Sequence, residues 1–141
     1  MKRIVFAIAA AGLLMAACGG QARPAAETPK QVVAWKRVGS WSGRGNRQTE
    51  SFTSDSGALR IRWTATPGNQ PTGDAGDLRV TAHSAISGRL LEQVVDHHGA
   101  GSGVGYVNQD PHVFYLMVES DRVEWTLAVE EAIAGTVTGQ R

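Results

Sequence analysis

The chain has few of the residues that stabilise small proteins through covalent or metal bonds. Its 141 residues include one cysteine, which excludes an intrachain disulfide and a zinc site built on cysteines. An excess of positive charge is also lacking, with 14 Lys and Arg against 13 Asp and Glu. Domains that bind nucleic acid are usually strongly basic, so this balance argues against a nucleic-acid partner. The remaining composition, with 42% hydrophobic residues and 17 glycines, suits one compact domain.

The apolar run near the N-terminus is too short to cross a bilayer as a helix. Residues 4–17 are 14 uncharged residues that follow Lys2 and Arg3. Extended to Gly20, the run reaches 17 residues, whereas a spanning helix needs about 20. A positive tip before a short apolar segment is typical of a secretory signal. The sequence therefore predicts a signal peptide over residues 1–17.

The end of this signal carries a short motif, Leu14-Met15-Ala16-Ala17-Cys18-Gly19. It resembles the lipobox of bacterial lipoproteins, in which two small residues precede a cysteine. The resemblance implies that the Cys18 sulfur is joined to diacylglycerol and that Cys18 becomes the new N-terminus. The sequence departs from the family at Met15, where the family prefers leucine. The alternative is an ordinary cleaved signal that leaves Cys18 as a free thiol.

Acylation of Cys18 makes the lipid bilayer the predicted partner, because two or three acyl chains hold a protein on a membrane almost permanently. We expect a lipid anchor on the exported side of a bacterial membrane. Gly19 stands where the lipoprotein family uses an Asp for inner-membrane retention, which favours the outer membrane in a cell with two. Residues 18–31 are rich in small residues and proline and predict a tether. Twelve such residues span about 20 Å when flexible.

From residue 32 onward the chain alternates apolar and polar residues in short runs broken by Gly, Asn, Asp and Pro. This pattern predicts an all-β fold, a small antiparallel β-sandwich or jelly roll of about eight strands over residues 32–131. The predicted strands are 35–41, 48–53, 59–64, 77–83, 90–96, 104–108, 112–119 and 123–130. The predicted core consists of Phe52, Ile61, Trp63, Phe114, Leu116, Val118, Trp125 and Leu127. Residues 132–141 are mostly small and polar and predict a loose tail.

The body also resembles small secreted bacterial β-sandwich domains for which no function is established. The resemblance rests on the order of six short stretches along residues 35–130. These stretches are 39–43, 48–52, 59–63, 101–103, 114–116 and 123–125. It implies the sandwich fold and adds no catalytic residue.

Motifs for catalysis are scarce. No serine lies in Gly-x-Ser-x-Gly, and the glycine-rich run 99–105 lacks the lysine and helix of a phosphate-binding loop. We interpret that run as a flexible or bulged connection between strands. Asp96, His97, His98 and His112 offer the ligand types of a zinc or copper site, with solvated turn residues as the alternative. Because neighbouring strand residues point to opposite faces, we predict neither a metal nor another cofactor. The scarcity of catalytic motifs predicts no enzyme activity.

Three surface features lead to hypotheses about binding. Trp41, flanked by Ser40 and Ser42, suggests a platform for a sugar ring, and burial in the core is the alternative. The strand around Tyr115 is apolar on both faces, so its second face is either covered or offered to a partner. Residues 36–62 hold six cations against two acids, whereas residues 110–131 hold six acids against one cation. These rows either form a basic face for anionic lipid or neutralise each other on paired strands.

Together these features predict a membrane-anchored, exported lipoprotein that acts as a non-enzymatic binding or envelope-support module. Its expected partners are the bilayer, through acylated Cys18, and an envelope protein or a glycan. The ligand contacts suggested by the sequence are Trp41 and Tyr115. A carbohydrate-binding module that contacts cell-wall or exogenous glycans is the alternative.

Overall fold

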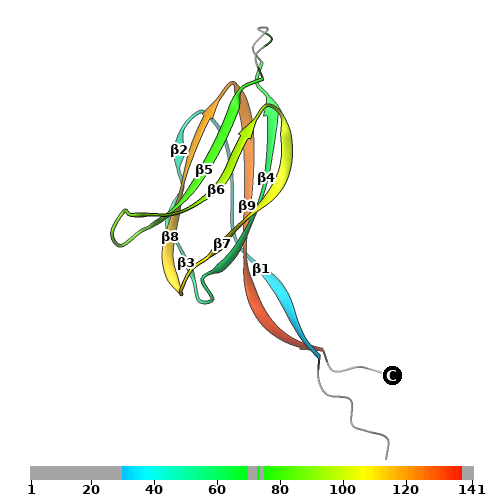
Figure 1. Cartoon of the computed structure of the whole chain (residues 1–141), viewed down its shortest axis with the longest axis vertical. Coiled ribbons are helices and arrows are strands. Elements are labelled where there is room, and N and C mark those ends of the chain that lie inside the picture. Colours follow the sequence, from blue (N-terminus) through cyan, green and yellow to red (C-terminus); the bar gives the residue numbers. More distant parts are fainter. Residues whose placement is uncertain (1–29, 70–72, 74, 138–141) are drawn as a thin grey trace, which may run out of the picture.

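The computed structural model describes residues 30–69, 73 and 75–137 (Figure 1). The predicted signal peptide, Cys18 and the tether up to residue 29 lie outside these residues. The described residues form two antiparallel sheets packed face to face, which confirms the predicted β-sandwich. The strands are β1 (Lys30–Arg44), β2 (Arg47–Gln48), β3 (Phe52–Ser54), β4 (Ala58–Pro67), β5 (Asp77–Ser84), β6 (Leu90–His98), β7 (Gly101–Asn108), β8 (His112–Asp121) and β9 (Val123–Val137). Within these ranges no helix is long and apolar enough to span a membrane.

The strand order is that of a jelly roll. One sheet runs β1-β9-β4-β7, and the other runs β2-β8-β5-β6 with β3 also paired to β8. The strands β2 and β3 lie along the same neighbour, so they occupy one strand position interrupted at residues 49–51. The pairs are therefore nested: β1 with β9, β2 and β3 with β8, β4 with β7, and β5 with β6. Such nesting of eight strand positions across two sheets defines a jelly roll.

The core lies between the two sheets and is built from alternate residues of each strand. Along β4 and β9 the inward rows are Leu59, Ile61 and Trp63, and Trp125, Leu127 and Val129, because side chains alternate across a strand. All eight side chains of the predicted core are buried. The paired leucines and valines of 90–95 lie in a strand, as predicted.

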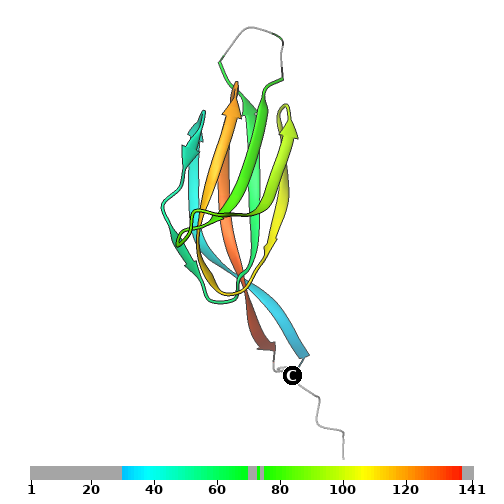
Figure 2. The same cartoon turned by 60° about the vertical axis from the view of Figure 1, so that its left-hand side comes forward.

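The first and last strands continue past the sandwich as a two-stranded ribbon (Figures 1 and 2). The pairing of β4 with β9 ends at Leu59 and Glu131, whereas β1 and β9 stay paired as far as Lys30 and Val137. The predicted loose tail 132–141 is therefore wrong for residues 132–137, which continue β9. Residues 30 and 31, assigned to the tether, belong to β1. Residues 138–141 lie outside the described residues.

Size complementarity explains why a tail of small residues forms a strand. From residue 32 to residue 35, each larger residue of β1 lies opposite a small one: Trp35 opposite Ala132, Val33 opposite Ala134 and Val32 opposite Gly135. At the base of the ribbon the buried Glu131 carboxylate accepts hydrogen bonds from Ser54 Oγ at 2.8 Å and from the Asp55 amide at 3.0 Å. This bond pair fixes β9 to the turn between β3 and β4 where the ribbon begins.

The glycine-rich run is mostly a strand and not the flexible connection that the sequence suggests. Only residues 99 and 100 form a turn, and β7 begins at Gly101. A Cβ added at Gly103 would stand 2.9 Å from Trp63 Cζ2, and one at Gly105 would overlap Val94 Cγ1 and lie 2.5 Å from the Val94 carbonyl. The glycines thus allow β7 to pack closely against neighbouring side chains and backbone.

We expect Gly105→Ala to lower the free energy of unfolding by about 1–3 kcal/mol, because the added methyl overlaps rigid backbone and a packed valine. Gly135→Ala is the matched control, since its Cβ meets its nearest neighbour at 3.5 Å, an ordinary contact. Urea unfolding of both variants tests this expectation. Equal stability of the two variants would show that β7 does not need the close approach.

Candidate functional site

The ribbon defines two ends of the molecule. The end from which the ribbon leaves, here called the tether end, also carries the turns β3–β4 and β7–β8 (Figure 2). The opposite end, here called the far end, carries the turns β1–β2, β6–β7 and β8–β9. Because β1 is the described strand nearest in sequence to Cys18, the far end is the one remote from any attachment at that residue.

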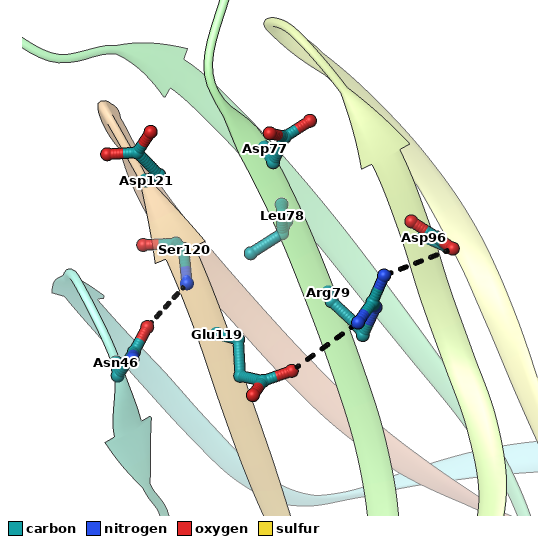
Figure 3. A pocket seen from close by; sticks show the side chains of 8 residues that line it. All are labelled: Asn46, Asp77, Leu78, Arg79, Asp96, Glu119, Ser120 and Asp121. Atoms are coloured by element: carbon teal, nitrogen blue, oxygen red, sulfur yellow. Dashed lines mark hydrogen bonds and ion pairs between the residues drawn. The ribbon is translucent and has the colours of Figure 1, made fainter.

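An open depression of about 620 Å³ lies on the outer face of β5, β6 and β8 near the far end (Figure 3). Four carboxylates and one guanidinium give it a net negative charge. Its lining residues are Asn46, Asp77, Leu78, Arg79, Asp96, Glu119, Ser120 and Asp121. We call this surface the acidic depression.

The strand register brings these charges together. Arg79 on the central strand β5 is opposite Asp96 of β6 and Glu119 of β8, and its guanidinium nitrogens lie 3.8 Å and 3.9 Å from their carboxylates. Asp77, two residues earlier, is directly opposite Asp121. Like charges in opposed cross-strand positions destabilise a sheet. The two opposed acids each have a partner, since Arg122 Nε donates a hydrogen bond to Asp121 Oδ2 at 2.9 Å and His98 Nδ1 lies 2.7 Å from Asp77 Oδ1.

Exposure decides what the acidic depression can do. The side chains of Asp77, Asp96, Glu119 and Asp121 are each more than half exposed. Ion pairs at such exposure contribute about 0–1 kcal/mol, so these charges add little stability. Solvated carboxylates on an open surface suit the attraction of a positively charged partner more than proton transfer to an enclosed substrate.

The structure separates the histidines that the sequence groups with Asp96. His98 Nδ1 lies 2.7 Å from Asp77 Oδ1, whereas the neighbouring His97 turns to the other face and packs on Trp63, with ring centroids 4.7 Å apart. His112 Nε2 pairs with Ser84 Oγ at 2.6 Å. In the described part of the chain, no three His, Cys, Asp or Glu residues converge on a point where a metal ion fits.

Trp41 lies on the inner side of β1, opposite Leu127, and its ring is half-buried at the edge of the core. Its ring centroid is 5.6 Å from that of Phe52, and a Cβ at Gly39 would overlap the indole. The indole Nε1 donates a hydrogen bond to Glu50 Oε2 at 2.5 Å. A backbone hydrogen bond at Glu50, followed by this bond from the indole, lowers the pKa of the Glu50 carboxyl below its ordinary value. The ring therefore closes the sandwich edge, and only part of it is open to a ligand.

Tyr115 lies on the outer face of β8, and its ring is also half-buried. It stacks on His83 of β5 with centroids 5.0 Å apart and an interplanar angle of 11°. Val113 and Met117 flank it on the same row and are half-buried as well. The second apolar face of this strand is thus partly covered by β5, and its remaining surface stays a candidate contact.

The opposed charge rows of the sequence lie largely on paired strands. On the outer face of the other sheet, Glu130 of β9 binds Arg60 of β4 through a short hydrogen bond and lies 3.3 Å from the Arg62 Nε. Arg44 pairs with Glu124 in the same way. Mutual neutralisation is therefore the correct interpretation for these residues. The hydrogen bond from Arg60, with the charges of Arg62 and Arg37, holds the pKa of the Glu130 carboxyl below its ordinary value.

The acidic depression was not among the sites suggested by the sequence. Its charges come from three strands, and the sequence signal is only that Asp77 and Arg79, Asp96, and Glu119 and Asp121 occupy outward rows. That signal becomes informative once β5 is known to lie between β6 and β8.

Comparison with known proteins gives no residue a role. A search against protein-family models and a search of curated protein sequences each found no match to this chain. The candidate surfaces therefore rest on geometry and charge.

We expect Trp41→Ala to lower the free energy of unfolding by about 2 kcal/mol, less than the 3–5 kcal/mol typical of a fully buried tryptophan. Trp41→Phe, the control, keeps the contact with Phe52 and loses only the hydrogen bond to Glu50. Chemical denaturation measures both. An unchanged stability in Trp41→Ala would mean that the ring is not part of the core edge and is free for a ligand.

We expect Glu130→Gln to destabilise the protein near neutral pH and to have little effect in acid. A carboxyl with a lowered pKa stabilises the fold above its unfolded value of about 4.5, and this contribution is lost as the pH falls through the folded pKa. Thermal midpoints of the parent and the variant should therefore converge once the pH lies below the folded pKa of Glu130. Glu119→Gln is the control, because its cation lies 3.9 Å away and both partners are exposed. A constant difference across the pH range would contradict the proposed charge contribution.

Proposed function

We propose that the protein is an exported lipoprotein, anchored by acyl chains on Cys18, whose β-sandwich is a non-enzymatic binding module of the cell envelope. One observation supports this function above the others. The first residues of β1, which follow the tether in the sequence, form one strand of the ribbon at the tether end (Figure 1). The acidic depression lies near the far end.

The length of the tether makes this arrangement effective. Lys30, where β1 begins, is twelve residues after Cys18, and twelve flexible residues span about 20 Å. A sandwich held at this distance from the bilayer keeps its ribbon near the membrane and leaves its far end free to reach the aqueous side. In a cell with two membranes, Gly19 in place of the family's retention Asp favours the outer one.

The acidic depression determines the kind of partner. Its four carboxylates outnumber the two arginines beside them, because Arg79 lies between Asp96 and Glu119 and Arg122 pairs with Asp121. A protein segment with clustered Lys or Arg complements this surface. Charge complementarity of exposed groups mainly raises the rate and specificity of association. The proposed module therefore recruits a basic envelope protein without transforming it.

Two measurements test this function. The intact mass of the protein purified from membranes should correspond to a chain that starts at Cys18 and carries acyl groups. A mass that retains residues 1–17, or that shows an unmodified Cys18, would contradict the lipoprotein.

The binding role is tested by crosslinking in envelopes. We expect one reproducible partner whose yield falls several-fold in Asp77→Asn/Asp121→Asn and in high salt. Asp55→Asn/Asp110→Asn removes the same charge at the tether end and should leave the yield unchanged. Equal yields from the two double variants would remove the acidic depression as the binding surface.

A further inference from the structure

The part of the ribbon that extends beyond the sandwich exposes apolar side chains on both faces. We call this part, residues 30–35 of β1 and 132–137 of β9, the free ribbon. Val33 on one face is 65% exposed, and Ile133 on the other is 40% exposed. Ala34 and Ala134 are exposed beside them. The sequence has no charged residue in 31–35 or in 132–137. An apolar segment of this kind needs an additional covering surface.

The backbone of the free ribbon also lacks neighbouring strands. The neighbour β4 stops at Leu59, opposite Glu131, so β9 has no second partner strand beyond that residue in the described chain. Six residue pairs, from Trp35 with Ala132 to Lys30 with Val137, are held by β1 and β9 alone. An isolated two-stranded pair is marginal in water, so contact with another surface stabilises it.

The residues at the base of the free ribbon indicate the chemistry of that surface. Trp35 is half-buried and lies under the Arg60 guanidinium, whose Cζ is 4.5 Å from the ring centroid. Lys36 and Arg37 follow immediately and are exposed. The order along β1 is thus Lys30 and Gln31 at the tip, then apolar residues that end in a tryptophan, then two cations. Tryptophan and cations beside a short apolar segment are typical of contacts at the membrane interface.

We propose that the free ribbon docks in the interfacial region of a bilayer with anionic lipids. This inference rests on the proposed function, because a tether from an acylated Cys18 of about 20 Å brings the ribbon to the membrane. The apolar side chains of residues 32–35 and 132–134 enter the headgroup boundary, and Lys30, Lys36 and Arg37 face lipid phosphates. The unpaired edges of β1 and β9 limit the depth, because backbone groups without partners do not enter the hydrocarbon.

A second copy of the chain fits this surface less well. Antiparallel pairing of the two β1 edges along residues 30–37 would set residue 30 of one copy opposite residue 37 of the other. Both positions are cationic, and like charges in opposed positions destabilise a strand pair. An anionic lipid surface neutralises the same charges.

The test uses the mature protein as cells produce it, reconstituted into phosphatidylcholine and phosphatidylglycerol vesicles whose acyl chains carry bromine near the headgroup. Bromine quenches tryptophan fluorescence only at short range. The chain has four tryptophans, of which Trp63 and Trp125 are buried in the core. We expect bromine to quench one component of the tryptophan fluorescence, and Trp35→Phe should remove that component. Val33→Asp/Ile133→Asp should abolish the quenching because the tip can no longer enter the interface.

Val104→Asp is the matched control, since Val104 is 46% exposed on β7, away from the free ribbon. The tryptophan fluorescence of this variant should be quenched as in the parent. Val33→Asp alone serves as a second variant, and near-ultraviolet circular dichroism confirms the fold of each. Quenching that persists in both ribbon variants, or is absent in the parent, would overturn the docking. A dimer with a protected ribbon would assign the surface to a second copy instead. The intact mass reports acylation separately, so a failure of the lipid anchor and a failure of docking are distinguishable.

Discussion

The pairing of the first strand with the last is the constraint on which the rest of the structure depends. Fourteen residue pairs join β1 to β9, and β9 lies between β1 and β4 in its sheet. The same strand therefore supplies Trp125, Leu127 and Val129 to the core and forms one side of the ribbon. This pairing brings both ends of the described chain to one end of the sandwich. The proposal that the tether end faces the membrane and the far end faces away from it follows from that placement.

The jelly-roll order also separates the charges of the two outer faces. On the sheet that holds β4 and β9, arginines meet glutamates in adjacent rows, as Arg60 and Arg62 do with Glu130. On the other sheet, β5 offers one arginine to acids from both neighbouring strands and begins with Asp77 opposite Asp121. Exposed pairs stabilise a fold only slightly. The uneven neutralisation therefore bears on recognition, where an uncompensated surface selects a partner of opposite charge.

Alternation along single strands is enough to predict the sandwich and its core from the sequence, because burial of Ile61 or Leu127 is a property of its own strand. The failures concern properties shared between strands. Residues 132–137 look like a tail until they are placed opposite Val33 and Trp35, and Gly103 looks flexible until it is placed beside Trp63. The acidic depression is distributed over three strands in the same way. Cys18, which the structure does not describe, remains a prediction from the lipobox.

The proposed acyl anchor and the proposed docking of the ribbon would restrict different motions of the module. Acyl chains hold a protein at the membrane but leave its direction free, because a flexible tether of about 20 Å transmits no orientation. The β1 strand is 15 residues long, or about 50 Å at 3.3 Å per residue. Free rotation of the module about its tether would therefore move the acidic depression through a large volume. Contact of the free ribbon with the bilayer removes most of this freedom. A partner fixed in the same envelope then meets the acidic depression at a higher effective concentration, because fewer orientations of the module are unproductive.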